Sequence, residues 1–493
     1  MRPEPTRVLP LLRRALHLLG GCAVIGGPAA AQSASRPGPH VTDSAIVRDL
    51  GIQFRQLARD SAFSGTVLLA RNGKILFQGS AGYADRAAGI ANSEHTRFNL
   101  GSLGKVFTAV AVLQLADAHR LSLDDPIGAL LSDYPNAVVA SRVTVRQLLE
   151  HTSGLGDVFG QRYLATPGAY CGASSYLPLF AWDTLSGTVG TKWLYSNAGY
   201  IVLGLIVERV SGQSFGAYLR DHVFRPAGMS ESGGYAALER LPNRATGYTT
   251  RHTFGPPTPG ELPSSNQAML PACGGPAGGG YSTASDLLRL EAALRRHTIL
   301  STQSTVLLMT GGVVEDANAP EAKYSLGLEE LTVNGVRMVG HGGNFPGVST
   351  AFDMYPELGY TVVVLSNADN GIQTVNFRLR WILRGQADEL PTFVHLLPSQ
   401  LRAFAGTYAV ATDSQGDARE VEPPMRVTAD TTGLLLDMGA RRAKRRFLPV
   451  GGAAFVDRDL LPLRLTFAVD AAGVVTGLKL VGGGPPMSAR RVP

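Results

Sequence analysis

The strand-forming segments of this chain fall into two blocks, which lie on either side of a long, mostly helical stretch. The first block, Gly65 to Gln78, predicts a β-hairpin, because two apolar runs flank Asn72-Gly73, a pair that tolerates the positive φ angles of a tight turn. The second block contains four apolar segments, which are Tyr324 to Leu331, Val336 to Gly340, Thr350 to Tyr355 and Tyr360 to Ser366. This order predicts one antiparallel sheet that takes strands from both blocks, with a helical region inserted between them.

Helices are predicted at both ends of this unit and inside the inserted region. Thr42 to Arg59 has apolar residues at helical spacing before the first strand block, and Thr374 to Leu383 follows the second block. Further helices are predicted within the insertion, over Val106 to Leu115, Val145 to Leu149, Tyr200 to Val210 and Ser285 to Leu294. We therefore predict an α+β fold in which helices flank an antiparallel sheet.

After Leu401 the pattern changes to short strands broken by Gly and Asp turns, which predicts a small antiparallel β-barrel. The predicted strands are Met425 to Val427, Leu434 to Met438, Phe455 to Val456, Leu463 to Val469 and Gly477 to Val481. The length of 493 residues also favours two domains, because single hydrophobic cores seldom grow that large. We place the first domain at residues 42–387, a linker at 388–398 and a lipocalin-like barrel at 399–493.

Residues 1–31 are typical of a secretory signal peptide. Two arginines precede the apolar segment Ala15 to Ile25, and Ala29-Ala30-Ala31 provides an A-x-A cleavage pattern. The apolar segment is too short and too rich in glycine to span a membrane stably. We predict that the mature protein is secreted or periplasmic. An alternative stays open, in which Leu19 to Cys22 is a lipoprotein box and Cys22 carries a lipid anchor.

The charge balance gives little support to nucleic-acid binding. The formal net charge is +6, but four arginines and one glutamate belong to the predicted signal peptide, so the mature chain carries about +3. One basic run, Arg441 to Arg446, is predicted to be a solvated hairpin end, with attraction to anionic polymers of the cell envelope as the alternative. The predicted partner is a small-molecule or peptide substrate, and the sequence leaves the oligomeric state open.

Two cysteines, Cys171 and Cys273, remain once the signal peptide is removed. In an oxidising compartment an even pair is a candidate disulfide, and two free thiols that never meet are the alternative. The cysteines are isolated, H-E-x-x-H is absent, and the sequence has no phosphate-binding loop. We therefore predict no metal and no cofactor.

The segment Ser102-Leu103-Gly104-Lys105 opens the predicted helix over Val106 to Leu115. Residues i and i+3 share one helix face, so the amine of Lys105 can reach the hydroxyl of Ser102. A helix N-terminus stabilises an alkoxide and disfavours a protonated lysine, and a serine becomes a nucleophile only when a neighbouring base takes its proton. The tetrapeptide alone leaves a second interpretation open, namely a surface serine beside a solvated lysine.

Several further segments extend this motif in a fixed order. They are Phe63 to Leu68, Phe98 to Lys105, Leu121 to Pro126, Leu148 to Leu155 and Gly278 to Leu287. Through them, residues 60–370 resemble the penicillin-recognising serine hydrolases, which include class C β-lactamases, D-alanyl-D-alanine carboxypeptidases, D-aminopeptidases and related esterases. The segment Leu401 to Tyr408 resembles the start of the barrel domain appended to some members.

The resemblance implies that Ser102 is the nucleophile, and that Lys105 and Tyr195 together remove its proton and later protonate the leaving group. Tyr195-Ser196-Asn197 fits the family's Y-x-N motif, and Asn197 would orient the substrate and contact Lys105. Because the free pKa of tyrosine is near 10, Tyr195 needs a cation such as Lys105 beside it to form phenolate. From the residues alone, the alternative is a core tyrosine and an asparagine that caps the next helix.

His341-Gly342-Gly343 follows the predicted strand Val336 to Gly340, where β-lactamases and many penicillin-binding proteins carry K-T-G. In such a site the glycines let substrate backbone lie against the strand edge, and the backbone N–H groups of Ser102 and Asn344 form the oxyanion hole. Histidine is mostly neutral at pH 7, whereas lysine is a permanent cation that can hold a substrate carboxylate. This favours a peptidase or esterase over an efficient β-lactamase, with a purely structural His341 as the alternative.

Within the resembled family the H-T-S-G stretch usually holds a loop behind the site, so we interpret His151 as structural rather than as the base for Ser102. We expect Gly156 to Lys192 and Tyr248 to Gly278, two segments with no regular pattern, to set substrate choice. A bond between Cys171 and Cys273 would tie these two loops together across the mouth of the site.

The predicted function is therefore an exported serine hydrolase that cleaves an amide, an ester or a β-lactam by acyl transfer through an acyl-Ser102 intermediate. The alternative is a catalytically slow sensor protein of the same fold, which binds penicillin or cell-wall fragments without turning them over.

Overall fold

The computed structural model describes residues 41–236, 241–254, 258, 261–317, 319–369, 371–386, 390–410, 424–438, 444–458, 463–481 and 487–492. The predicted signal peptide with Cys22, the first two residues of the predicted linker and residues 441–443 of the basic run lie outside the described residues. None of the helices in the described ranges is long and apolar enough to cross a membrane.

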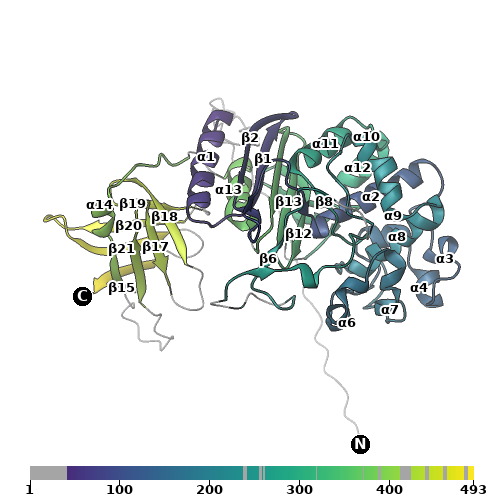
Figure 1. The fold of residues 1–493 in the computed structure, drawn as a ribbon. Coiled ribbons are helices and arrows are strands. Elements are labelled where there is room, and N and C mark those ends of the chain that lie inside the picture. The colour runs from purple at the N-terminus through teal and green to yellow at the C-terminus, as the bar shows by residue number, and fades with distance from the viewer. Residues whose placement is uncertain are drawn as a thin grey trace, which may run out of the picture. The chain divides into compact units, whose positions relative to one another are not determined.

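An eight-stranded antiparallel sheet forms the centre of the part of the chain from α1 to α13 (Figure 1). Its strands come from both ends of this part, as the sequence predicted, so the α+β fold prediction is confirmed. In sheet order they are β2 (Lys74–Ala81), β1 (Gly65–Arg71), β14 (Tyr360–Ser366), β13 (Val348–Tyr355), β12 (Val336–Phe345), β11 (Glu329–Val333), β10 (Ala322–Tyr324) and β9 (Val313–Val314). The predicted hairpin turn is present between β1 and β2, where Asn72 and Gly73 have φ angles of 52° and 79°.

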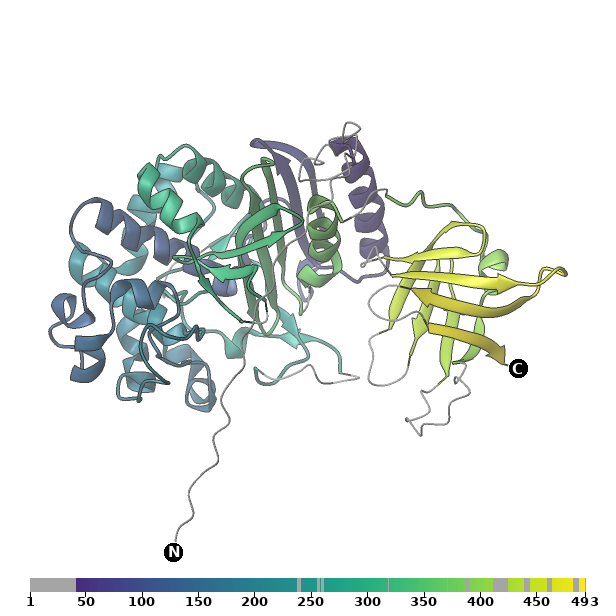
Figure 2. The same ribbon diagram turned by 180° about the vertical axis from the view of Figure 1, so that it is seen from behind.

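Helices cover both faces of this sheet, as Figures 1 and 2 show from opposite sides. On one face α1 (Asp43–Arg59) and α13 (Gly371–Leu383) pack against Val67, Leu69 and their neighbours. The other face carries the inserted helical region, which packs against Leu68 and Ala70. Alternate residues of one strand thus belong to two different cores, as the two-residue period of a strand requires.

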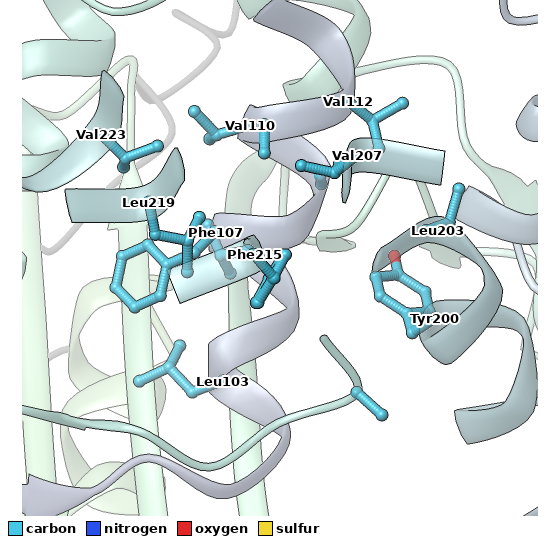
Figure 3. Packing of buried hydrophobic residues seen from close by; sticks show 14 of the residues in the cluster. Leu103, Phe107, Val110, Val112, Tyr200, Leu203, Val207, Phe215, Leu219 and Val223 are labelled. Carbon is cyan, nitrogen blue, oxygen red and sulfur yellow. The ribbon is translucent and has the colours of Figure 1, made fainter. Parts of the chain in front are cut away.

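Helix α2 (Lys105–Asp117) runs through the middle of the inserted region. It is apolar on all sides and almost wholly buried, as expected for a helix that is surrounded by other elements. Figure 3 shows its packing against α8 (Asn197–Ser211) and the segment that follows α8. The labelled side chains are Leu103, Phe107, Val110 and Val112 around α2, Tyr200, Leu203 and Val207 on α8, and Phe215, Leu219 and Val223 beyond it.

The remaining elements before α14 are short, apart from two helices, α11 (Ala284–Arg295) and α12 (Thr302–Met309). The short helices include α3 (Ile127–Leu130), α4 (Ala137–Arg142), α5 (Val145–Leu149), α6 (Gln161–Ala165), α7 (Leu177–Phe180), α9 (Phe215–Tyr218) and α10 (Arg225–Ala227). Small two-stranded pairs are β3 (Tyr83–Asp85) with β4 (Ile90–Ala91), β5 (Phe98–Asn99) with β8 (Tyr281–Ser282), and β6 (Tyr248–Thr249) with β7 (Ser264–Ser265).

Two strand predictions have wrong bounds, and both lie close to the candidate site. The segment Tyr324 to Leu331, predicted as one strand, is a tight hairpin in which β10 ends at Tyr324 and β11 begins at Glu329. Gly327 makes this turn with a φ of 103°, and a Cβ there would collide with the side chain of Ala109 on α2. Strand β12, predicted to end at Gly340, continues to Phe345 because its last five residues still pair with β13.

The C-terminal strands close into an eight-stranded antiparallel barrel. Short helix α14 (Pro398–Arg402) precedes β15 (Gly406–Val410), β16 (Met425–Ala429), β17 (Leu434–Asp437), β18 (Arg445–Gly451), β19 (Ala454–Asp457), β20 (Arg464–Val469), β21 (Val475–Val481) and β22 (Met487–Val492). Its interior is filled by side chains that include Leu401, Tyr408, Phe447, Phe455 and Phe467.

Three barrel strands, β15, β18 and β22, were not predicted from the sequence. Strands β18 and β22 carry arginines, which obscure the apolar alternation. The prediction of a solvated hairpin end is wrong for the last two residues of the basic run. Arg445 and Arg446 begin β18, and they form ion pairs with Asp457 and Asp430, respectively.

Candidate active site

The serine and lysine of the S-x-x-K motif meet at the start of α2. Ser102 lies in η1 (Gly101–Gly104), a single 3-10 turn that continues directly into the helix at Lys105. Lys105 Nζ lies 3.3 Å from Ser102 Oγ. The lysine side chain is completely buried, whereas Ser102 is half-buried and lines the cavity described below.

The partners of Lys105 define where its amine points. Nζ donates to Asn197 Oδ1 at 2.6 Å and to the backbone carbonyl of Ala277 at 2.5 Å. The orientation of the Asn197 amide follows from its other end, because Nδ2 lies 2.8 Å from Asp157 Oδ1, which can only accept. Two N–H bonds of Lys105 Nζ therefore point to acceptors. The remaining tetrahedral position of Nζ, apart from its bond to Cε, faces Ser102 Oγ.

Burial lowers the pKa of Lys105 from its ordinary value to about 7, although the nearby Asp157 carboxylate acts in the opposite direction. A large share of the amine is then neutral at neutral pH, and its lone pair faces the hydroxyl of Ser102. The rings of Tyr195 and Tyr200 lie 4.8 and 5.4 Å from Nζ, where they stabilise the charged form that follows proton uptake.

Tyr195 belongs to the loop that leads into α8 and is almost fully enclosed. Its pKa is raised far above the ordinary range by burial, which outweighs the lowering effect of a hydrogen bond with the Ser102 hydroxyl. The negative charges of Glu329 and Asp157 raise the pKa further. The geometry thus favours a neutral phenol at Tyr195, in contrast to the phenolate that was expected from the sequence.

His151 holds the Y-x-N loop in place from behind. It is fully buried, and its Nδ1 accepts a hydrogen bond of 3.0 Å from the backbone N–H of Ser196. Its ring lies 4.3 Å from that of Tyr195, centre to centre. Burial and the charge of Lys105 lower its pKa well below the ordinary value, so the ring stays neutral. This position agrees with the interpretation of His151 as structural.

His341 lies in β12, and both of its ring nitrogens have protein partners. Nδ1 is 2.5 Å from the carbonyl oxygen of Gly342, which can only accept, so this nitrogen carries the proton. Nε2 then accepts from the hydroxyl of Tyr324 at 2.9 Å. Burial lowers the pKa of His341 to about 3, with a further contribution from the charge of Lys105. His341 is therefore neutral and presents no positive charge to the cavity.

Strand β12 brings a free edge next to Ser102. Its neighbour β11 pairs with it only from Val336 to Gly340, so within the described residues the stretch from His341 to Phe345 pairs on the β13 side alone. Gly343 packs against the turn before Ser102, where a Cβ would collide with the carbonyl oxygen of Leu100. This close approach places the backbone nitrogen of Asn344 beside Gly101, the residue that precedes Ser102.

A cavity of about 460 Å³ opens onto these groups. Ser102, Tyr195, Asn197, Gly343 and Asn344 all line it, so the structure gathers most of the predicted site residues around one space. Lys105 lies beneath this lining, and the Asn344 side chain is exposed.

The walls of the cavity come from the two loops that were predicted to set substrate choice. Phe159 and Phe254, one from each loop, meet Phe345 at ring-centre distances of 6.0 and 5.3 Å. The structure pairs Cys171 with Cys273, whose Cα atoms are 5.1 Å apart, and so joins the loops. The first loop is more regular than predicted, since it contains α6 and α7.

The charged groups on the described cavity lining are all acidic. Two carboxyl groups, those of Asp157 and Glu329, line the cavity, and among the described residues no lysine or arginine does. The same part of the chain contains no cluster of His, Cys, Asp and Glu that could hold a metal ion. Sequence reasoning missed Glu329 and Tyr324, because no motif marks either residue.

Comparisons with known proteins agree with this geometry. The family model described as Beta-lactamase matches residues 53–387. The chain belongs to the beta-lactamase family. The resemblance stated from the sequence is thereby confirmed.

Among relatives in this beta-lactamase family, penicillin-binding protein 4* of Bacillus subtilis is 30% identical over 350 residues, which cover 69% of this chain and 76% of that protein. Esterase EstB of Burkholderia gladioli is 32% identical over 290 residues, or 51% of this chain and 71% of the esterase. The solved penicillin-binding protein from Bacillus halodurans matches with 33% identity and a TM-score of 0.60, covering 67% of this chain and 99% of its own. The chain is accordingly a serine hydrolase of the beta-lactamase family.

Proposed function

We propose that the protein is an exported hydrolase that cleaves esters or amides through an acyl-Ser102 intermediate. The observation that carries this proposal is the buried amine of Lys105, which is held by two acceptors so that its remaining position faces Ser102 Oγ at 3.3 Å. A neutral amine in that position is a general base for the serine, and its pKa of about 7 matches neutral operating pH.

Acylation begins when Lys105 Nζ takes the proton of Ser102 and Oγ attacks the substrate carbonyl carbon. The carbonyl oxygen becomes an oxyanion, which the backbone N–H groups of Ser102 and Asn344 stabilise. The proton then passes from Lys105, through the hydroxyl of Tyr195, to the leaving alcohol or amine. The Tyr195 phenol supports this step, because its raised pKa keeps a proton available for transfer.

Deacylation repeats these steps with water. Water enters where the leaving group stood, gives its proton to the same Tyr195 and Lys105 pair, and attacks the acyl carbon. The second tetrahedral intermediate collapses and returns the proton to Ser102 Oγ. Asn197 keeps Lys105 in position throughout, because its amide is fixed at the other end by Asp157.

The charge of the cavity argues for neutral or cationic substrates. Carboxypeptidase substrates and β-lactams carry a carboxylate near the scissile bond, and a site for them needs a cation to hold it. Here His341 is neutral, and the described lining offers only Asp157 and Glu329 as charged groups. Three phenylalanines on the walls suit an aromatic or branched acyl group.

Active-site labelling and turnover test the proposal together. A fluorescent fluorophosphonate should label the wild-type protein at Ser102, and Ser102→Ala should abolish that labelling. The wild type should also hydrolyse p-nitrophenyl butyrate continuously. Labelling that survives Ser102→Ala would refute the nucleophile, and a stable acyl adduct without turnover would identify the sensor protein instead.

Export is tested separately. Expression of the full chain in a Gram-negative host should yield a periplasmic protein whose N-terminal residue is Gln32. A palmitate-labelled N-terminal Cys22 would establish the lipoprotein alternative, and an uncleaved cytoplasmic chain would contradict export.

A further inference from the structure

Glu329 lies at the end of the paired stretch between β11 and β12. It is the first residue of β11 and pairs with Gly340, the last residue of β12 to have a partner on that side. Beyond Gly340 the free edge of β12 continues to Asn344, whose amide belongs to the proposed oxyanion hole. A strand rises about 3.3 Å per residue, so Glu329 lies about 13 Å along the strand from that hole. It lines the same cavity as Ser102.

The Glu329 carboxyl group has no partner within the described residues, where no hydrogen bond or ion pair involves its side chain. The nearby cation Arg380 is already engaged, because its Nε and Nη2 each donate to a carboxylate oxygen of Asp353 at 2.7 Å. Glu315 and Asp353 add negative charge around Glu329. Such a carboxyl group is unfavourable to bury unless a positive charge approaches it.

The other acidic residue of the lining differs in this respect. Asp157 accepts from the Asn197 amide and from the backbone N–H groups of Val158 and Phe159, at 2.7 to 3.0 Å. All three bonds go to Oδ1, so the protein itself holds this oxygen of the carboxylate. Glu329 is the carboxyl group of the cavity lining for which the described part of the chain offers no hydrogen bond or ion pair.

Glu329 lines the same cavity as Tyr195, and it is the cross-strand partner of Tyr324 in the hairpin of β10 and β11. Its negative charge raises the pKa of both tyrosines. Because Tyr195 protonates the leaving group in the proposed mechanism, the leaving group must lie beside Tyr195 during catalysis. A charged substituent on the leaving group would therefore point toward Glu329.

We propose that Glu329 is a specificity-determining residue that binds a positively charged substituent on the leaving alcohol or amine and repels a carboxylate there. The substrates would be esters or amides whose departing half carries an ammonium or guanidinium group. This inference rests on the proposed function and extends it by naming the substrate class.

Three phenylacetyl esters that share one acyl group test the proposal. Their alcohols are choline, its neutral isostere 3,3-dimethylbutanol and 4-hydroxybutyrate, and release of phenylacetate at pH 8 is followed by chromatography. For the wild type we expect kcat/KM for the choline ester to exceed that for the neutral ester by at least about tenfold, with the anionic ester slowest. Glu329→Gln should bring the three values to within about threefold.

Glu330→Gln is the matched control. It removes the same charge from the next residue of β11, but Glu330 does not line the cavity and its carboxylate lies 3.8 Å from Arg337. We expect the wild-type preference in this variant. The neutral ester reports in every variant whether the fold and the catalytic groups are intact.

The outcomes separate the two proposals. Equal rates for the three esters in the wild type, or a choline preference that persists in Glu329→Gln, would overturn the role of Glu329 while leaving the hydrolase assignment in place. Failure of the wild type to hydrolyse any of the esters would overturn the proposed function, and the inference with it.

Discussion

The pH dependence of ester hydrolysis distinguishes Lys105 from Tyr195 as the base for Ser102. An ordinary lysine of pKa 10.5 is neutral in about one molecule in 3,000 at pH 7, whereas a pKa of about 7 leaves about half of the molecules neutral. Burial thus raises the population of the reactive amine by about three orders of magnitude. This difference corresponds to about 5 kcal/mol between the two protonation states.

The sign of the effect follows from the form that works as a base. Neutral Lys105 is required, so kcat/KM should be maximal above pH 7 and should fall about tenfold per pH unit below it. His341, with a pKa of about 3, and His151, whose pKa is lowered well below its ordinary value, stay neutral across this range. Burial raises the pKa of Glu329 to about 7, so the group titrates there as well.

The assay therefore uses the Glu329→Gln variant and the uncharged 3,3-dimethylbutyl ester between pH 5 and pH 10. A single midpoint near pH 7 with unit slope is expected. A midpoint above pH 9 would mean that a Tyr195 phenolate is the base, with Lys105 as its cationic partner. A profile that is flat from pH 5 to pH 8 would refute both assignments.

Three further outcomes are expected. Gly343→Ala should lower kcat by about 10²- to 10³-fold, because the added Cβ would collide with the carbonyl oxygen of Leu100 and displace the Asn344 amide. Unchanged steady-state kinetics would contradict an oxyanion hole at Asn344. Tyr195→Phe should slow an alkyl ester more than its p-nitrophenyl counterpart, whose leaving group needs no proton, and equal losses would argue against Tyr195 as the acid. Replacement of Cys171 and Cys273 by serine should raise KM for a phenylacetyl ester while leaving kcat for p-nitrophenyl acetate unchanged; a parallel fall in kcat would show that the disulfide supports the catalytic groups themselves.

Local patterns were enough to predict most of the sheet and to single out Ser102 and Lys105, whereas the Y-x-N and H-G-G residues were assigned through the family resemblance. Asn72-Gly73 predicted the hairpin between β1 and β2 because that turn depends on those two residues alone. The turn at Gly327 escaped detection, since its glycine is required by contact with Ala109 on a distant helix. The arginine-rich strand β18 escaped because apolar alternation is weak where side chains form ion pairs.

The electrostatic character of the site lay beyond the reach of the sequence. Tyr195 and Lys105 could be recognised as partners, but their protonation states depend on how completely other segments bury them. Glu329 had no signal at all, because its importance comes from β11 beginning at that residue, where its pairing with β12 stops, and from Arg380 being engaged by Asp353.

The burial of Lys105 has a consequence for the path of the proton. Its amine has no exposed surface, and its hydrogen bonds besides that to Ser102 Oγ go to an amide oxygen and a backbone carbonyl, neither of which can carry a proton onward. The way onward therefore leads through the hydroxyls of Ser102 and Tyr195, which are hydrogen-bonded to each other. The proton taken from Ser102 therefore cannot exchange with bulk water while substrate fills the cavity, and it must return through the reacting atoms. Attack and departure of a basic leaving group, such as an alkyl alcohol or an amine, thus share one proton; if that group does not receive the proton, the tetrahedral intermediate expels Ser102 Oγ and returns to substrate.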